Sequence, residues 1–339
     1  GASMVFLLVL VHVYRGVFYG SSIYVSSVLS LGVLVYGVLM GIAFLGYVLP
    51  WGLMSYWGAT VITNLYTGVP CMVPWFLGGF YISNPTITRY FTIHLLVPIP
   101  VPVPLVLHIL YIHRISTSIG TGYNTSNNRV YFLTWLVAKD TLVLMQGLLV
   151  VLVQVYLGII MLAHPDNSLE ASVILTPIHI VPEWYFLGYY SILKAIPGKT
   201  SGFLVMIAWV IAGNIYGEPY STSGYTVGYP GYTGRYSMVF LLVLVVYYSL
   251  WIGVQLPQGI YVSYGRGYIL VSIGCNIGYT PEYHPPSSST STSIHCSLTR
   301  SPYPGPRGKY SSMDWLYNME PWVQAAARGT SDSRWRVSG

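Results

Sequence analysis

The fold is decided by residues 23–49, which read IYVSSVLSLGVLVYGVLMGIAFLGYVL and contain no Asp, Glu, Lys or Arg. A helix of about 20 such residues is long enough to cross the hydrocarbon core of a membrane. Residues 141–163 and 237–256 have the same apolar character and also lack charged side chains. These three stretches predict transmembrane helices.

The composition of the whole chain agrees with a membrane protein. Of its 339 residues 54% are hydrophobic and 7% are charged, whereas a typical soluble domain carries about 25% charged residues. The net charge of +6 does not indicate nucleic-acid binding, because the 15 Lys and Arg residues are spread without a run or a basic helix. Basic residues near the ends of apolar stretches anchor helices at membrane surfaces. We therefore expect contacts with membrane lipid and no nucleic-acid partner.

The pattern predicts an all-α fold, a polytopic transmembrane helix bundle of about seven spans, the first of them truncated. Residues 51–85 are rich in Trp, Gly and Pro and suit interfacial helices. The tail at 281–339 is dominated by Ser, Thr and Pro and is expected to be disordered or irregular. The expected spans are residues 1–14, 23–49, 88–113, 141–163, 202–216, 237–256 and 259–279.

Three histidines, His12, His94 and His108, lie in apolar surroundings. Ionisable side chains inside a membrane are costly and usually functional. On one α-helix His94 and His108 would lie about 40° apart in azimuth and about 21 Å apart along the axis. Imidazoles are axial ligands of haem iron, so this spacing suits two stacked haems. A lone histidine would more often bond to a neighbouring helix, but the pair with a third on another span favours ligation.

Glycines on a neighbouring span repeat this spacing, because Gly32 and Gly46 have the same separation as His94 and His108. Glycine leaves room where a flat macrocycle lies against the backbone. Glycine is also common in membrane helices, so this pair is weak evidence alone. With the histidines, it predicts haem contacts at both positions.

Alternating prolines between the two histidines conflict with a single helix: Pro98, Pro100, Pro102 and Pro104. Each interior proline removes a backbone donor and costs about 3 kcal/mol or more. Such a run favours an extended form with a rise of about 3.1 Å per residue. One hypothesis is that the mature polypeptide differs at these positions, for example through transcript editing, which peptide mass spectrometry across residues 89–113 would decide.

Longer strings carry a resemblance to a known family. They are GASM and HVYRG within 1–16, GYVLPWGLMSYWGATVITNL at 46–65, RYFTIH at 89–94, HPDN at 164–167, TPIHIVPEWYFLGYYSIL at 176–193 and, more loosely, WIGVQLP at 251–257. From residue 1 to about 280 the chain resembles cytochrome b of the respiratory quinol–cytochrome c oxidoreductase, complex III.

The resemblance implies two b-type haems as cofactors. His12 and His108 would hold the high-potential haem, and His94 would ligate the low-potential haem. The partner of His94 would precede residue 1, so we expect that ligand and the family's first helix outside this chain, in a separate chain or a missing segment. Arg15 and Arg89 would meet haem propionates, although anchoring at the membrane surface is a fair alternative.

The resemblance also implies a quinol-oxidation site around the PEWY string. A carboxylate beside aromatic rings is a plausible proton acceptor, and the family places Glu183 there as a catalytic residue. Without the resemblance, a Glu at the interface would more often cap a helix or form a salt bridge. Tyr190 occupies the family's second polar position. The remaining residues that we expect to line this pocket are Gly58, Pro182, Trp184 and Tyr185.

On the opposite side of the membrane the resemblance implies a quinone-reduction site. His113 and Asp140 would exchange protons with the quinone headgroup there. Lys139 is a weaker candidate for the same pocket, since an interfacial anchor is an equally good interpretation.

The resulting expectation is a haem-binding helical bundle with the quinol-oxidation loop at 1–200, transmembrane helices at 201–280 and the tail at 281–339. As a subunit of complex III, the chain would pass electrons from quinol through two haems to quinone and would couple this to proton translocation. Expected partners are an iron–sulfur protein, a cytochrome c-type subunit and a second copy of the complex, in the mitochondrial inner membrane. One alternative is a non-redox transporter with a histidine proton relay, which the absence of a b-type α-band in a difference spectrum would favour. A second is the photosynthetic relative of the family, but two features oppose it: that family has one more residue between the fourth-helix histidines and is split before PEWY.

Overall fold

The computed structural model describes residues 1–19, 26–115, 131–215 and 232–278. These residues are mainly helical and contain no β-strand, which confirms the predicted all-α bundle. The predicted tail at 281–339 lies outside the described residues. The helices are α1 (Ala2–Tyr19), α3 (Ser26–Val48), α4 (Leu53–Thr63), α5 (Met72–Leu77), α6 (Asn84–Leu96), α7 (Pro102–Ile115), α8 (Val137–Leu157), α9 (Leu187–Ala195), α10 (Lys199–Ile215), α11 (Tyr232–Val254) and α12 (Gly259–Gly278), with short 3-10 turns η1 (Asn64–Gly68), η3 (Pro165–Ser168) and η4 (Trp184–Phe186) and a π-helical turn η2 (Phe132–Leu136).

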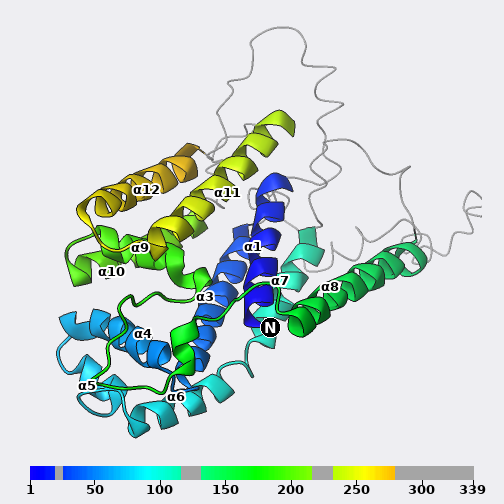
Figure 1. The fold of residues 1–339 in the computed structure, drawn as a ribbon. Helices are drawn as coiled ribbons and strands as arrows, with labels where there is room; N and C mark the ends of the chain where they lie inside the picture. Colours follow the sequence, from blue (N-terminus) through cyan, green and yellow to red (C-terminus); the bar gives the residue numbers. More distant parts are fainter. Residues whose placement is uncertain (20–25, 116–130, 216–231, 279–339) are drawn as a thin grey trace, which may run out of the picture.

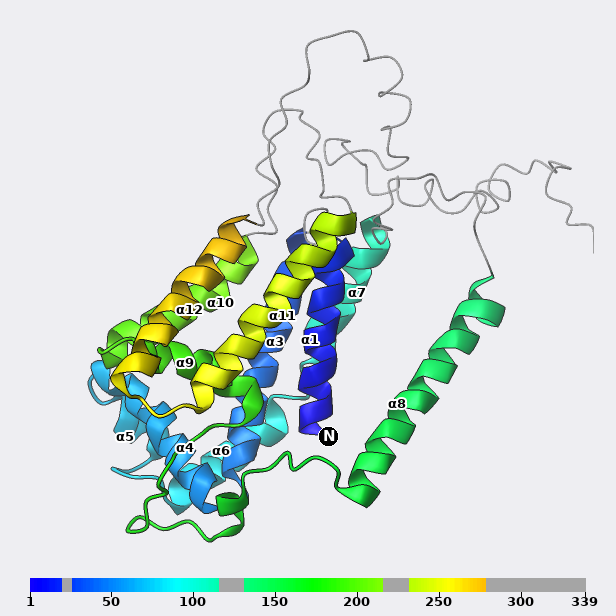
Figure 2. The ribbon, with the colours of Figure 1, turned by 45° about the horizontal axis from the view of Figure 1, so that its top comes forward.

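The long helices form a bundle whose members run roughly side by side (Figures 1 and 2). Helix α3 packs against α6 and α7, α1 packs against α11, and α9 packs against α10, α11 and α12. The short helices α4 and α5 lie at one end of the bundle. Helix α8 stands apart from the bundle in both views, and its side chains are mostly exposed.

Three of the described helices are long and apolar enough to cross a membrane: Ala2–Tyr19, Ser27–Val48 and Phe132–Leu157. Shorter apolar helices cover Pro102–His113, Lys199–Val210 and Val239–Val254. The span expected at 141–163 begins earlier and α8 ends at Leu157. It ends there because Gly158 has a φ of +56° and the side chain of Gln154 bonds to the backbone N–H and carbonyl of Ile160.

The proline run interrupts the span expected at 88–113. Helix α6 ends at Leu96 and α7 begins at Pro102, so His94 and His108 do not share one helix, and the single-helix spacing was wrong. The extended form was also wrong, since turns with 3-10-type hydrogen bonds connect the two helices. The bonds run from Ile99 N–H to Leu96 carbonyl (3.2 Å), Val101 to Pro98 (3.2 Å) and Val103 to Pro100 (3.0 Å).

A loop distant in sequence caps helix α4. Its N-cap residue, Gly52, has no side chain to satisfy the free N–H groups of the first turn. The Oδ1 of Asn167 accepts the Ser55 N–H at 2.9 Å, and the Leu169 carbonyl accepts the Leu53 N–H at 2.8 Å. A Cβ at Gly52 would collide with Asn167, so glycine is required for this approach. The PWG string at the start of α4 and the HPDN string in the loop therefore hold each other in position.

Candidate functional site

His12 on α1 and His108 on α7 face one another, with ring centroids 6.3 Å apart and ring planes at 60°. Metal–imidazole bonds are about 2.0–2.1 Å long and a ring nitrogen lies about 1.1 Å from its centroid, so two imidazoles bound to one metal would have centroids at most about 6.3 Å apart. The Nδ1 of His108 is buried and lacks a hydrogen-bond partner among the described residues. Both observations fit two histidines that would together hold the iron of one haem.

The two glycines of α3 lie directly beneath histidine rings. A Cβ at Gly32 would come within 3.3 Å of Cε1 of His108, and a Cβ at Gly46 within 2.5 Å of Cε1 of His94. Any larger residue at Gly46 would displace the ring. The structure therefore places each of the two glycines against one of the two histidines, Gly32 against His108 and Gly46 against His94.

His94 on α6 has one ring nitrogen engaged. Its Nδ1 lies 2.9 Å from the carbonyl oxygen of Ile42 on α3. A carbonyl only accepts, so Nδ1 must donate, and Nε2 keeps its lone pair for a metal. Within the described part of the chain, no ring contact joins His94 to a second histidine.

Glu183 precedes η4 and is half-buried. Burial raises the pKa of its carboxyl group, while the Tyr47 hydroxyl and His164 oppose this rise. The Tyr47 hydroxyl makes no hydrogen bond of good geometry with any described residue, but it lies close enough to act on the carboxylate. Burial and the neighbouring Glu183 together raise the pKa of Tyr185 to about 12. The raised pKa means that this carboxyl group takes up a proton at a higher pH than an ordinary Glu does.

The aromatic residues around Glu183 are held by α1. Trp184 Nε1 donates to the Ser3 hydroxyl at 3.2 Å, and Tyr185 stacks on Phe6 with a centroid distance of 4.1 Å and an interplanar angle of 11°. These anchors were not predicted from the sequence. Ser3 lies within the GASM string and Phe6 lies two residues after it, so this string was the signal that could have pointed to them.

Two further residues expected at the quinol-oxidation pocket also lie in this region. Pro182 is half-buried immediately before Glu183. The Tyr190 hydroxyl on α9 donates to the Ile180 carbonyl at 3.2 Å. On α4, Gly58 faces open space, because a Cβ there would meet nothing within 4 Å.

Residues expected at the opposite site are not brought together. His113 at the end of α7 is exposed, as are Lys139 and Asp140 on α8. Helix α8 stands apart from α7 in Figure 2. The Lys139 ammonium lies 5.6 Å from the centroid of the Trp135 ring. Their grouping therefore stays a prediction.

The two arginines are both exposed. Arg89 donates to the Trp75 carbonyl at 2.6 Å and packs against Gly78, which has a φ of +73°. Arg15 lies one turn beyond His12 on α1. A role at haem propionates stays a prediction for both.

Apolar helices that carry two histidines facing one another, with glycines packed against the histidine rings, indicate a haem-binding membrane protein. Family models agree, since "Cytochrome b/b6/petB" matches residues 1–116 and "Cytochrome b(C-terminal)/b6/petD" matches residues 170–273. Cytochrome b of Toxoplasma gondii is 39% identical over 78% of this chain and 73% of its own length. Cytochrome b of Plasmodium vivax is 37% identical over 88% of this chain and 78% of its own length.

Among solved structures, a chain of a hyperthermophilic respiratory complex III superposes with a TM-score of 0.73 at 25% identity, covering 83% of this chain and 76% of that one. The chain belongs to the cytochrome b family. Within it, the matches support the role of the cytochrome b subunit of respiratory complex III, which binds haem and serves electron transport in the membrane.

Proposed function

We propose that this chain passes electrons from quinol at one membrane face through two b haems to quinone at the other, coupled to proton translocation. The observation that carries this proposal is the His12–His108 pair, whose 6.3 Å centroid separation suits two ligands of one metal. A bound b haem supplies a one-electron carrier within the membrane.

Each haem position has its own set of residues in this chain. His12 and His108 hold one haem against Gly32. His94 holds the other against Gly46, with its tautomer fixed by the Ile42 carbonyl. A second ligand for His94 comes from outside the described residues. Arg15 and Arg89 neutralise propionates.

At the quinol-oxidation site the proposed proton acceptor is Glu183. Oxidation of quinol to quinone releases two protons and two electrons, and the half-buried carboxylate takes up one of the protons. Tyr190 offers a hydroxyl to the headgroup. The wall of this pocket consists of Gly58, Pro182, Trp184 and Tyr185.

The quinone-reduction site lies at the opposite face of the membrane. Protons are supplied there by His113 and Asp140, with Lys139 at the rim. These residues are exposed on α7 and α8, and they meet when α8 packs within the assembled complex.

The matched structure belongs to a respiratory complex, so the chain works within a multi-subunit assembly. We propose an iron–sulfur protein, a cytochrome c-type subunit and a second copy of the complex as partners. The eukaryotic relatives favour the mitochondrial inner membrane as the location.

The test of this function is quinol-driven reduction in the purified complex. The proposal expects a b-type α-band to appear in the difference spectrum when quinol is added, together with reduction of cytochrome c. A complex with no b-type band, or one whose haem quinol does not reduce, contradicts it.

A further inference from the structure

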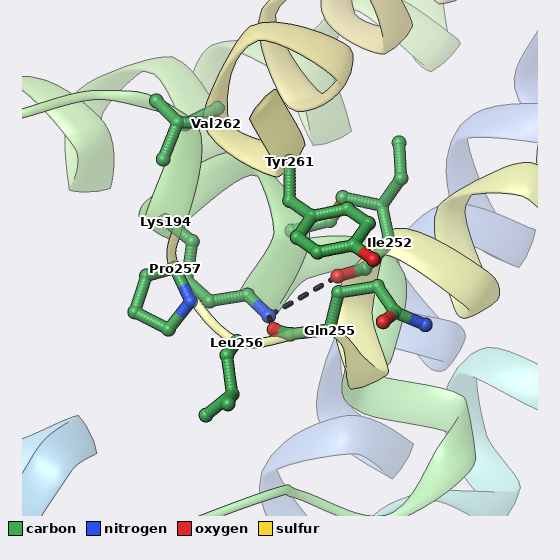
Figure 3. Close-up of a pocket in the computed structure, with 9 residues that line it drawn as sticks. Lys194, Ile252, Gln255, Leu256, Pro257, Tyr261 and Val262 are labelled. Atoms are coloured by element: carbon green, nitrogen blue, oxygen red, sulfur yellow. Dashed lines mark hydrogen bonds between the residues drawn. The ribbon is translucent and has the colours of Figure 1, made fainter. Parts of the chain in front are cut away.

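Lys194, near the C-terminal end of α9, lies against the end of α11. Its Nζ donates to the backbone carbonyls of Ile252, Gly253 and Gln255 at 3.1, 2.7 and 2.6 Å. Figure 3 shows the ammonium group reaching into this turn. A lysine has three donors, and the last carbonyls of a helix lack partners within it. The cation also opposes the negative end of the helix dipole, so Lys194 fastens α11 to α9.

Close packing fixes the position of this contact. A Cβ at Gly253 would lie 2.6 Å from the Leu187 carbonyl oxygen, so α11 touches the backbone of α9 at its other end. A Cβ at Gly265 would lie 2.9 Å from Cβ of Ala195, so α12 touches α9 beside Lys194. Helix α9 therefore has little freedom to shift against either helix.

The side chain of Lys194 is half-buried. The cavity beside it, lined by Ser191, Gln255 and Tyr261 among others, has a volume of about 10 Å³, room for one water at most. Burial lowers the pKa of Lys194 to about 8, so the side chain is still mainly a cation at neutral pH. A desolvated cation interacts more strongly with its neighbours than one in water.

One of those neighbours belongs to the quinol-oxidation pocket. The Nζ of Lys194 lies 4.7 Å from the centroid of the Tyr190 ring, one helical turn earlier on α9. A cation at this distance is attracted to the face of the ring. The Tyr190 hydroxyl in turn donates to the Ile180 carbonyl, just before Glu183. A continuous set of contacts thus joins the end of α11 to the loop that contains Ile180 and Glu183.

We propose that Lys194 is a positioning residue for the quinol-oxidation pocket. By binding the end of α11 while lying over the ring of Tyr190, it fixes the place at which the Tyr190 hydroxyl meets quinol. Lys194 acts through Tyr190 and does not itself touch quinol. This inference rests on the proposed function of the pocket.

The test uses the assembled complex carrying Lys194→Met, which keeps the side-chain length but removes the charge and the donors. The apparent KM for quinol is expected to rise about tenfold, while kcat changes by less than about threefold because Glu183 remains in place. Haem content should not change. Lys194→Arg retains the cation and should return KM to within about twofold of the wild type.

Two controls separate positioning from a general effect. Lys199→Met removes the same group at the exposed start of α10 and should leave both constants unchanged. In a Tyr190→Leu background, Lys194→Met should raise KM no further, because the residue through which it acts is already gone.

The inference is overturned if Lys194→Met leaves KM unchanged, or if it raises KM about tenfold in the Tyr190→Leu background as well. If Lys194→Met does not assemble, Lys194→Gln, which still has amide donors for the carbonyls, takes its place; failure of both shows a purely structural role and overturns the inference. A wild-type complex that oxidises no quinol contradicts the proposed function itself, whereas an active wild type with an unaffected variant contradicts the positioning role alone.

Discussion

Replacing Gly46 by alanine should remove the haem at His94 and leave the haem at His12 and His108. The added Cβ would lie 2.5 Å from Cε1 of His94, whereas carbon atoms in contact are about 3.5–4.0 Å apart. The ring must therefore move by about 1 Å or more. Metal–ligand distances tolerate only about 0.2 Å, so this shift abolishes ligation. It also stretches the 2.9 Å bond to the Ile42 carbonyl, which fixes the tautomer.

Gly32→Ala gives the matched comparison on the same helix. Its Cβ would lie 3.3 Å from Cε1 of His108, so a shift of about 0.2 Å restores an ordinary contact, which is within the tolerance of a metal–ligand bond, and the haem should be retained. Gly41→Ala is the neutral control, since a Cβ there would meet nothing within 4 Å. The assay is haem content with a redox titration of the b-type α-band. Retention of both haems at wild-type potentials in Gly46→Ala would refute the steric reasoning.

Three further predictions concern the oxidation loop and its support. Glu183→Gln should lower the rate of quinol oxidation on the order of 10²-fold, since the proton acceptor is lost. In the wild type, the pKa of Glu183 is raised, so the rate should fall as the pH drops through that pKa. A rate that stays constant down to the pH range in which an ordinary Glu titrates would oppose this role. Asn167→Ala should destabilise the α4 region by about 1 kcal/mol, because the Ser55 N–H loses its hydrogen-bond acceptor. Limited proteolysis should therefore cut this variant faster than a control variant at an exposed asparagine, Asn84→Ala. Equal cleavage rates in the two variants would count against the cap. Gly58→Ala should assemble with normal haem content, since its Cβ meets nothing within 4 Å, and a raised KM for quinol would place quinol against α4, whereas an unchanged KM would remove Gly58 from the pocket.

Local sequence patterns were enough to predict the long helices and to single out the two glycines. The run at 23–49 has no charge and no proline, so the membrane alone dictates a helix, and α3 covers Ser26–Val48. The glycine spacing matched that of the histidines, and in the structure Gly32 lies against His108 and Gly46 against His94, although the spacing alone did not say which glycine meets which histidine. A period along one helix is visible in sequence because it depends on residues a few turns apart.

Contacts between distant segments were not visible in the same way. The cap from Asn167 to α4 and the bonds from Lys194 to the end of α11 join residues far apart in sequence, and no local pattern encodes them. The path through the prolines was missed for a different reason. Alternating N–H groups between prolines remain free to donate, so turns with 3-10-type bonds outcompete the extended form.

The haem stoichiometry of the isolated complex tests the central claim most directly. Two b haems per copy of this chain, with the His108→Ala variant retaining only the haem at His94, is the predicted result. One haem in the wild type would mean that His94 holds none, and no haem would contradict the assignment of His12 and His108 as ligands.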